Sequence, residues 1–251
     1  MYEGSPTPVT GFFAAAPKFA AIALIARLVM GPFGDITDQW QQVIIVLAVM
    51  SMFIGAIGAL RQANIKRLMA YSSIANMGFA LVPLAAGTIA GVRGMLIFMT
   101  IYIITVIGIF ACILQMRIRD GMVEKISDLS GIAKTNRGLA IAMTIFMLSL
   151  MGIPPLLGFF GKLYAFLPAV QADLIWLVVL ALIASVIGAF YYLRIIKTMW
   201  FDESEHEFIQ PVRALSLTSA VSAFLLIGLI LVPFIAKSGQ NWIAMAATSL
   251  S

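Results

Sequence analysis

Seven long apolar runs constrain what this chain can fold into more than any other feature of its sequence. A helix needs roughly 20 apolar residues to cross a bilayer core of about 30 Å, because each residue adds about 1.5 Å. Most of the runs have that length, so we predict an all-α, polytopic membrane protein with about seven transmembrane helices. A single transmembrane domain is expected at residues 10–251 after a loop at 1–9, with spans at 10–30, 42–60, 68–90, 95–116, 138–171, 174–193 and 214–236.

Composition excludes several other classes of protein. Of the 251 residues, 62% are hydrophobic and 11% are charged, whereas a soluble domain carries about a quarter charged residues. A water-exposed surface cannot be built from this composition. The sequence therefore excludes a cytosolic enzyme, a secreted domain and a disordered chain.

The fifth run, residues 138–171, is too long for a straight transmembrane helix. Its 34 residues would extend about 50 Å, well beyond the bilayer core. Pro154 and Pro155 interrupt helical hydrogen bonding, and Gly158 and Gly161 follow them closely. We therefore predict one broken helix, with these four residues at the break.

The distribution of basic residues between the spans predicts how the chain is oriented. Cytoplasmic loops of membrane proteins collect Lys and Arg. The loops after the second, fourth and sixth spans hold eleven of the 16 Lys and Arg residues, whereas the loops on the opposite side hold only Arg93 and Lys237. This asymmetry predicts that the first residue of the chain is cytoplasmic and the last is outside.

Three basic residues, Lys18, Arg27 and Lys162, fall inside predicted spans. An ionisable group at the centre of a transmembrane helix is unfavourable by about 2.5–3.5 kcal/mol on insertion scales. All 11 acidic residues lie in loops or at span ends, so no carboxylate within a span can pair with these cations. Because desolvation disfavours the charged form of an ammonium group, Lys18 and Lys162 are candidates for proton transfer.

Both lysines lie close to a predicted helix break. Pro17 directly precedes Lys18, and the proline pair of the fifth run precedes Lys162. Broken backbone at membrane depth is tolerated where it lines a water-filled cavity or is buried in protein. The alternative is that these long side chains extend to the headgroups, which fits Arg27 best because it lies near the end of its span.

The third run begins with a group of polar residues, Tyr71, Ser72, Ser73 and Asn76. Ser72 and Asn76 are four residues apart and so share one helix face. Such a stripe can hold water along a proton path, or it can bond to neighbouring helices. Weaker candidates of the same kind lie in other spans: Thr100, Tyr102, Thr105, Ser149, Tyr164, Ser185 and Tyr191.

The sequence contains no motif for a cofactor, a metal or a catalytic nucleophile. Phosphate loops, dinucleotide fingerprints, haem or iron–sulfur ligand patterns and nucleophile triads are all missing. Cys112 is the only cysteine, and His206 lies in an acidic segment that is typical of a solvated loop. We therefore expect no catalytic residue, cofactor, metal or nucleic acid at this chain.

Three ordered stretches resemble the antiporter-like membrane subunits of respiratory complex I, the proton-pumping NADH:quinone oxidoreductase. They are YEGSPTPVT followed by Ala16-Pro17-Lys18, NIKRLMAYSSIANMG at 64–78, and SLMGIPP with Gly158-Phe159-Phe160-Gly161-Lys162. The first and third are most similar to NADH-quinone oxidoreductase subunit N.

The resemblance implies a 14-helix fold built from two inverted five-helix repeats, of which the seven predicted spans would be helices eight to fourteen. It places Lys18 on a central hydrophilic axis, Lys162 at the outward half-channel and Lys66 in a family motif. The first half of such subunits, with its membrane glutamate and lysine, is not in this sequence, so we expect a fragment or a split subunit. Asn76 stands where many relatives have His, which argues against a titrating group on that helix.

The resemblance also implies the setting in which the chain works. The implied setting is a proton-translocating translocase of the bacterial inner membrane that forms part of a respiratory electron-transport chain. The implied partners are neighbouring antiporter-like subunits and small membrane subunits, with FMN, iron–sulfur clusters and quinone held elsewhere in the complex. The alternative is a subunit of a multisubunit sodium/proton antiporter, which shares the motif that runs from Pro154 to Lys162. A membrane scaffold without transport activity would leave both lysines unexplained.

Overall fold

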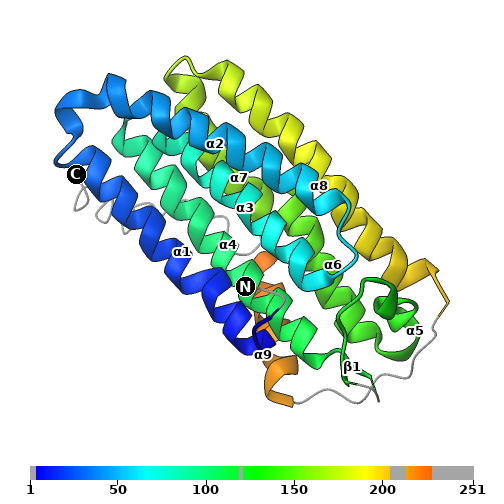
Figure 1. The fold of residues 1–251 in the computed structure, drawn as a ribbon. Helices are drawn as coiled ribbons and strands as arrows, with labels where there is room; N and C mark the ends of the chain where they lie inside the picture. The colour runs from blue at the N-terminus through cyan, green and yellow to red at the C-terminus, as the bar shows by residue number, and fades with distance from the viewer. Residues whose placement is uncertain (1–3, 119–120, 204–212, 228–251) are drawn as a thin grey trace.

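The computed structural model describes residues 4–118, 121–203 and 213–227. Within them the chain is a bundle of long helices whose axes are roughly aligned (Figure 1). The long helices are α1 (Thr7–Met30), α2 (Thr37–Leu60), α3 (Ile65–Leu84), α4 (Ile89–Gln115), α6 (Arg137–Met151), α7 (Leu157–Gln171), α8 (Ile175–Phe201) and α9 (Arg213–Leu226). Short elements connect them: η1 (Gly34–Ile36), β1 (Arg117–Ile118), β2 (Gly121–Met122), η2 (Ser127–Leu129) and α5 (Ile132–Thr135).

The all-α membrane fold is therefore confirmed. Four segments are long and apolar enough to cross a membrane, namely α1, residues 34–60, α4 and α8. The more polar α3, the broken pair α6–α7 and the described part of α9 follow the other three predicted runs. The small antiparallel hairpin of β1 and β2, at one end of the bundle, was not predicted.

The first helix begins earlier than predicted. Residues 1–9 were expected to be a loop because they contain Pro6 and Pro8, but α1 begins at Thr7. Proline fits the first turn of a helix, where its missing N–H would have no intrahelical partner. Pro17 is also no break, because α1 continues through it to Met30.

The boundary between the third and fourth spans also differs from the prediction. The run at 68–90 was expected to be one helix, but α3 ends at Leu84 and α4 already begins at Ile89. Gly87 has a φ of +64°, a conformation that favours glycine, and the Thr88 hydroxyl accepts a hydrogen bond from the Gly91 amide at the start of α4. The apolar residues around this turn concealed it in the sequence.

The predicted break in the fifth run separates α6 from α7. Gly152, with a φ of +84°, ends α6, and Pro154 and Pro155 lie between the helices. Gly158 and Gly161 lie within α7 and not at the break. A Cβ on Gly158 would lie 1.8 Å from the Ser149 carbonyl oxygen, so glycine allows the start of α7 to pack against the end of α6.

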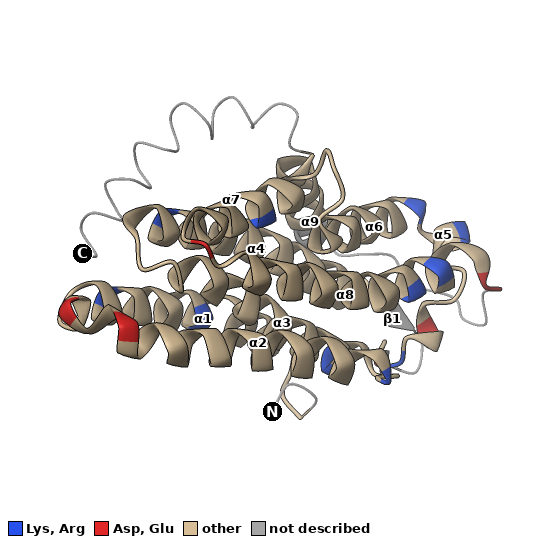
Figure 2. Ribbon diagram, turned by 90° about the horizontal axis from the view of Figure 1, so that it is seen from above, with Lys and Arg blue, Asp and Glu red and all other residues tan. Residues whose placement is uncertain are grey.

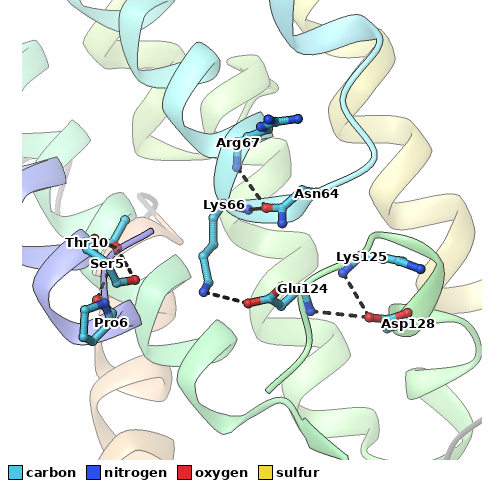
Figure 3. A network of polar contacts seen from close by, with 9 residues as sticks. All are labelled: Ser5, Pro6, Thr10, Asn64, Lys66, Arg67, Glu124, Lys125 and Asp128. Atoms are coloured by element: carbon cyan, nitrogen blue, oxygen red, sulfur yellow. Dashed lines mark hydrogen bonds and ion pairs between the residues drawn. The ribbon is translucent and has the colours of Figure 1, made fainter. Parts of the chain in front are cut away.

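One end of the bundle carries most of the basic residues. Figure 2 shows most of the Lys and Arg residues gathered at the end with α5 and β1, and the others lie elsewhere along the bundle. At the basic end, Lys66 Nζ lies 3.3 Å from Glu124 Oε1, which ties α3 to the segment after β2 (Figure 3). The Arg194 guanidinium donates to the carbonyl oxygens of Leu60 and Gln62, which fixes α8 to the end of α2.

Candidate proton-transfer site

Lys162 is held inside the bundle by the break between α6 and α7. Its Nζ donates to the Met151 carbonyl oxygen at 3.0 Å and to Ser185 Oγ of α8 at 2.6 Å. Met151 is the last residue of α6, and the final carbonyls of a helix lack intrahelical partners and carry partial negative charge. The break thus supplies an acceptor for the ammonium group of Lys162, a residue that is only 8% exposed.

The described side chains that contact the Lys162 ammonium group are neutral. Its Nζ lies 5.0 Å from the centre of the Phe79 ring, a distance at which a cation interacts favourably with an aromatic face. Among the described residues, no carboxylate forms an ion pair with Lys162. A Cβ on Gly152 would lie 3.0 Å from Cδ of Lys162, so the turn also leaves room for the lysine side chain.

Lys18 contacts the polar group in the middle of α3. This lysine is half-buried on α1, and its Nζ donates to Ser73 Oγ. The Tyr102 hydroxyl of α4 donates to the same Ser73 oxygen at 2.8 Å. Ser73 therefore joins Lys18 to Tyr102, and both Ser73 and Tyr102 are buried.

The other polar residues of α3 divide into two groups. Ser72 Oγ lies 2.5 Å from the Tyr192 hydroxyl of α8, and Asn76 Nδ2 donates to the Ser72 carbonyl oxygen at 2.8 Å. Tyr71 points elsewhere, because its ring lies against Gly58 of α2. The structure thus brings Ser72, Ser73 and Asn76 together inside the bundle and leaves Tyr71 outside this group.

A small cavity inside the bundle connects this polar group with Lys162. Its polar lining consists of Asn76, Tyr102, Thr105, Ser149 and Lys162. A second small cavity is lined by Ser72 and again by Tyr102. Lys18, Ser73, Tyr102, the first cavity and Lys162 therefore form one sequence of contacts, which we call the lysine-to-lysine chain.

Sequence reasoning identified some members of this group and missed others. Lys18, Ser72, Ser73, Asn76 and Lys162 were selected because charged or clustered polar groups are conspicuous in apolar runs. Three residues ranked low, namely Tyr102 and Ser149 of the cavity lining and Ser185, the partner of Lys162. A single polar residue in an apolar run does not indicate which other helix it contacts. Tyr192 was not selected. Arg27 is exposed near the end of α1, and His206 lies outside the described residues.

In the part of the chain that the structure describes, no three His, Cys, Asp or Glu side chains lie close enough to hold a metal ion. Cys112 is buried on α4.

Comparison with known proteins shows the family. Residues 1–188 match the family model described as NADH:quinone oxidoreductase/Mrp antiporter, TM. The chain belongs to this family. Curated family members that resemble it include NADH-quinone oxidoreductase subunit N of Maricaulis maris, 59% identical over 83% of this chain, and subunit N 1 of Rhizobium meliloti, 50% identical over 92%. The resemblance to subunit N is therefore confirmed.

The matched region is only part of each of these relatives. It covers 44% of the Maricaulis maris protein and 48% of the Rhizobium meliloti protein, so the chain spans about half the length of the curated relatives it matches.

Two solved structures share the fold of this chain. A chain of respiratory complex I from Thermus thermophilus with bound Aureothin has a TM-score of 0.80 and 31% identity, over 94% of this chain and 52% of that one. A chain of the Mrp complex from Dietzia sp. has a TM-score of 0.78 over 97% of this chain and 53% of that one, and at 21% identity this likeness concerns the fold alone.

Proposed function

We propose that this chain forms part of a proton-translocating subunit of an NADH:quinone oxidoreductase, in which Lys18 and Lys162 take up and release the transported protons. The observation that carries the proposal is the lysine-to-lysine chain, which joins the two ammonium groups through Ser73, Tyr102 and a shared cavity. The relatives at 50–59% identity, which are named as subunits of this complex, support it.

The contacts of Lys162 suit a group that changes its charge. A neutral amine can still donate to the Met151 carbonyl oxygen, and it can accept the proton of the Ser185 hydroxyl. A carboxylate partner would instead hold the ammonium in its charged form. The site therefore accommodates both protonation states without leaving a buried carboxylate behind.

The proposal places this chain beside other antiporter-like subunits and small membrane subunits, in the bacterial inner membrane. FMN, iron–sulfur clusters and quinone would belong to other subunits, and this chain would contribute no redox group. The end with α5 and β1 would face the cytoplasm, because it gathers the basic residues (Figure 2).

Lys18→Ala in the assembled complex tests the proposal. Vesicles should retain the complex, but their NADH-driven proton uptake should fall by about tenfold or more, as expected when a proton-transferring group is removed. Lys197→Ala is the matched control, because Lys197 is a lysine of α8 whose side chain is 64% exposed. Normal proton uptake in Lys18→Ala at normal assembly would contradict the proposal.

A sodium/proton antiporter subunit is the second candidate, since the matching family model covers both classes. Vesicles would then exchange Na⁺ for H⁺ without added NADH or quinone. The names of the relatives favour the oxidoreductase.

A further inference from the structure

The Tyr102 hydroxyl occupies a central place in the lysine-to-lysine chain. On one side it donates to Ser73 Oγ, the atom that also accepts from Lys18. On the other side Tyr102 lines the cavity that Lys162 also lines. Among the described residues, Tyr102 is the one hydroxyl that both contacts the partner of Lys18 and borders the cavity of Lys162.

The cavity also contains a polar atom that needs a partner. Ser149 Oγ is buried, its residue is 1% exposed, and no group in the described part of the chain bonds to it. The other small polar groups of the lining are already bonded to backbone, because Thr105 donates to the Ile101 carbonyl and Asn76 to that of Ser72. A buried water typically takes two to four such polar partners.

We infer that Tyr102 relays protons between Lys18 and Lys162, together with a water molecule bound by Ser149 in the cavity. This inference rests on the proposed function and names the residues that connect its two lysines.

The transfer is balanced at every atom. The Lys18 ammonium gives a proton to the Ser73 oxygen, and the Ser73 hydroxyl proton passes to the Tyr102 oxygen. The Tyr102 proton passes to the cavity water, and that water gives a proton to neutral Lys162. Lys18 becomes neutral and Lys162 becomes charged, while both hydroxyls and the water keep their composition.

The Tyr102 hydroxyl can take two orientations, one toward Ser73 and one toward the cavity. The hydroxyl donates its one proton to Ser73 Oγ, so it cannot at the same time donate to a water in the cavity. Rotation of the hydroxyl toward the cavity lets Tyr102 donate to the water and reverses the first bond, so that the Ser73 hydroxyl donates to the Tyr102 oxygen. Tyr102 thereby opens or closes the connection without movement of a helix.

Tyr102→Phe in the assembled complex tests the relay, because it removes one oxygen and keeps the ring. NADH-driven proton uptake should fall about tenfold, the effect of losing one strong hydrogen bond in the path. The ratio of the proton-uptake rate in H₂O to that in D₂O should be higher in the variant, because proton transfer then limits the rate. Tyr164→Phe is the matched control, since Tyr164 is a half-buried tyrosine of α7 that does not line the cavity.

Two further variants separate the possible outcomes. Ser149→Ala removes an oxygen that no group in the described residues bonds to, and proton uptake should fall by about threefold as the water loses a bond. It also serves as the test if Tyr102→Phe assembles poorly. Impaired uptake in Lys162→Ala with wild-type uptake in Tyr102→Phe or Ser149→Ala overturns the relay alone. Wild-type uptake in Lys162→Ala overturns the proposed function and the relay with it.

Discussion

At the scale of single residues, the position of Lys162 depends on Gly152. This glycine has a φ of +84°, which a residue with a Cβ adopts at a cost of roughly 1–2 kcal/mol. The added Cβ would also press on Cδ of Lys162 at 3.0 Å. Gly152 therefore ends α6 and makes room for the lysine at the same time.

We predict that Gly152→Ala destabilises the chain by about 1–2 kcal/mol, because the strained backbone conformation persists in the folded state. The decrease should appear as a lower unfolding temperature and less assembled complex in the membrane. Gly138→Ala is the control, because a Cβ there meets nothing within 4 Å and alanine favours the helix. Equal stability of both variants would contradict this account of the turn.

At the scale of elements, the segment after β2 is fixed to the start of α3 by both charge and backbone. The Ile65 amide donates to the Glu124 carbonyl oxygen at 2.9 Å, and the Ile126 amide donates to the Ala63 carbonyl oxygen at 2.8 Å. The Lys66–Glu124 ion pair lies beside these bonds (Figure 3), with the Lys66 side chain 7% exposed and that of Glu124 55% exposed.

We predict that Glu124→Gln loosens this connection, because it removes the charge that faces a buried ammonium group. The free energy of local opening should fall by about 1 kcal/mol, since Glu124 is more than half exposed and water screens the pair. Hydrogen exchange at the Ile65 and Ile126 amides should become several-fold faster. Asp202→Asn, which removes the charge that faces the exposed Lys197, should leave both amides unchanged. Unchanged exchange rates in Glu124→Gln would contradict this prediction and show that the backbone hydrogen bonds alone hold the connection.

The sequence predicts some elements better than others, for physical reasons. Long apolar runs and the proline pair revealed most helices and the break at Gly152. The turn at Gly87 stayed hidden because apolar residues continue through it, and the start of α1 was misplaced because proline both ends helices and opens them. Tyr192 could not be placed because its hydrogen bond to Ser72 joins residues that are 120 positions apart in the chain.

At the scale of the whole molecule, the charge asymmetry predicts how the bundle lies in the membrane. Single cysteines placed at Ser127 of η2 and Gly34 of η1, in a background with Cys112→Ala, should react with an impermeant thiol reagent from opposite sides. Ser127 and Gly34 are both exposed, and Ser127 lies near the basic end. Ser127 should react from the cytoplasm. Reaction of both cysteines from one side would contradict the proposed orientation.

The central claim is that Lys162 carries a proton that moves, and the comparison of Lys162→Arg with Lys162→Ala tests it most directly. A guanidinium keeps a positive charge but stays protonated, so it cannot pass the proton on. We predict that NADH-driven proton uptake in vesicles is lost to a similar degree in both variants at normal assembly. Wild-type proton uptake in Lys162→Arg would show that only the charge matters and would contradict the claim.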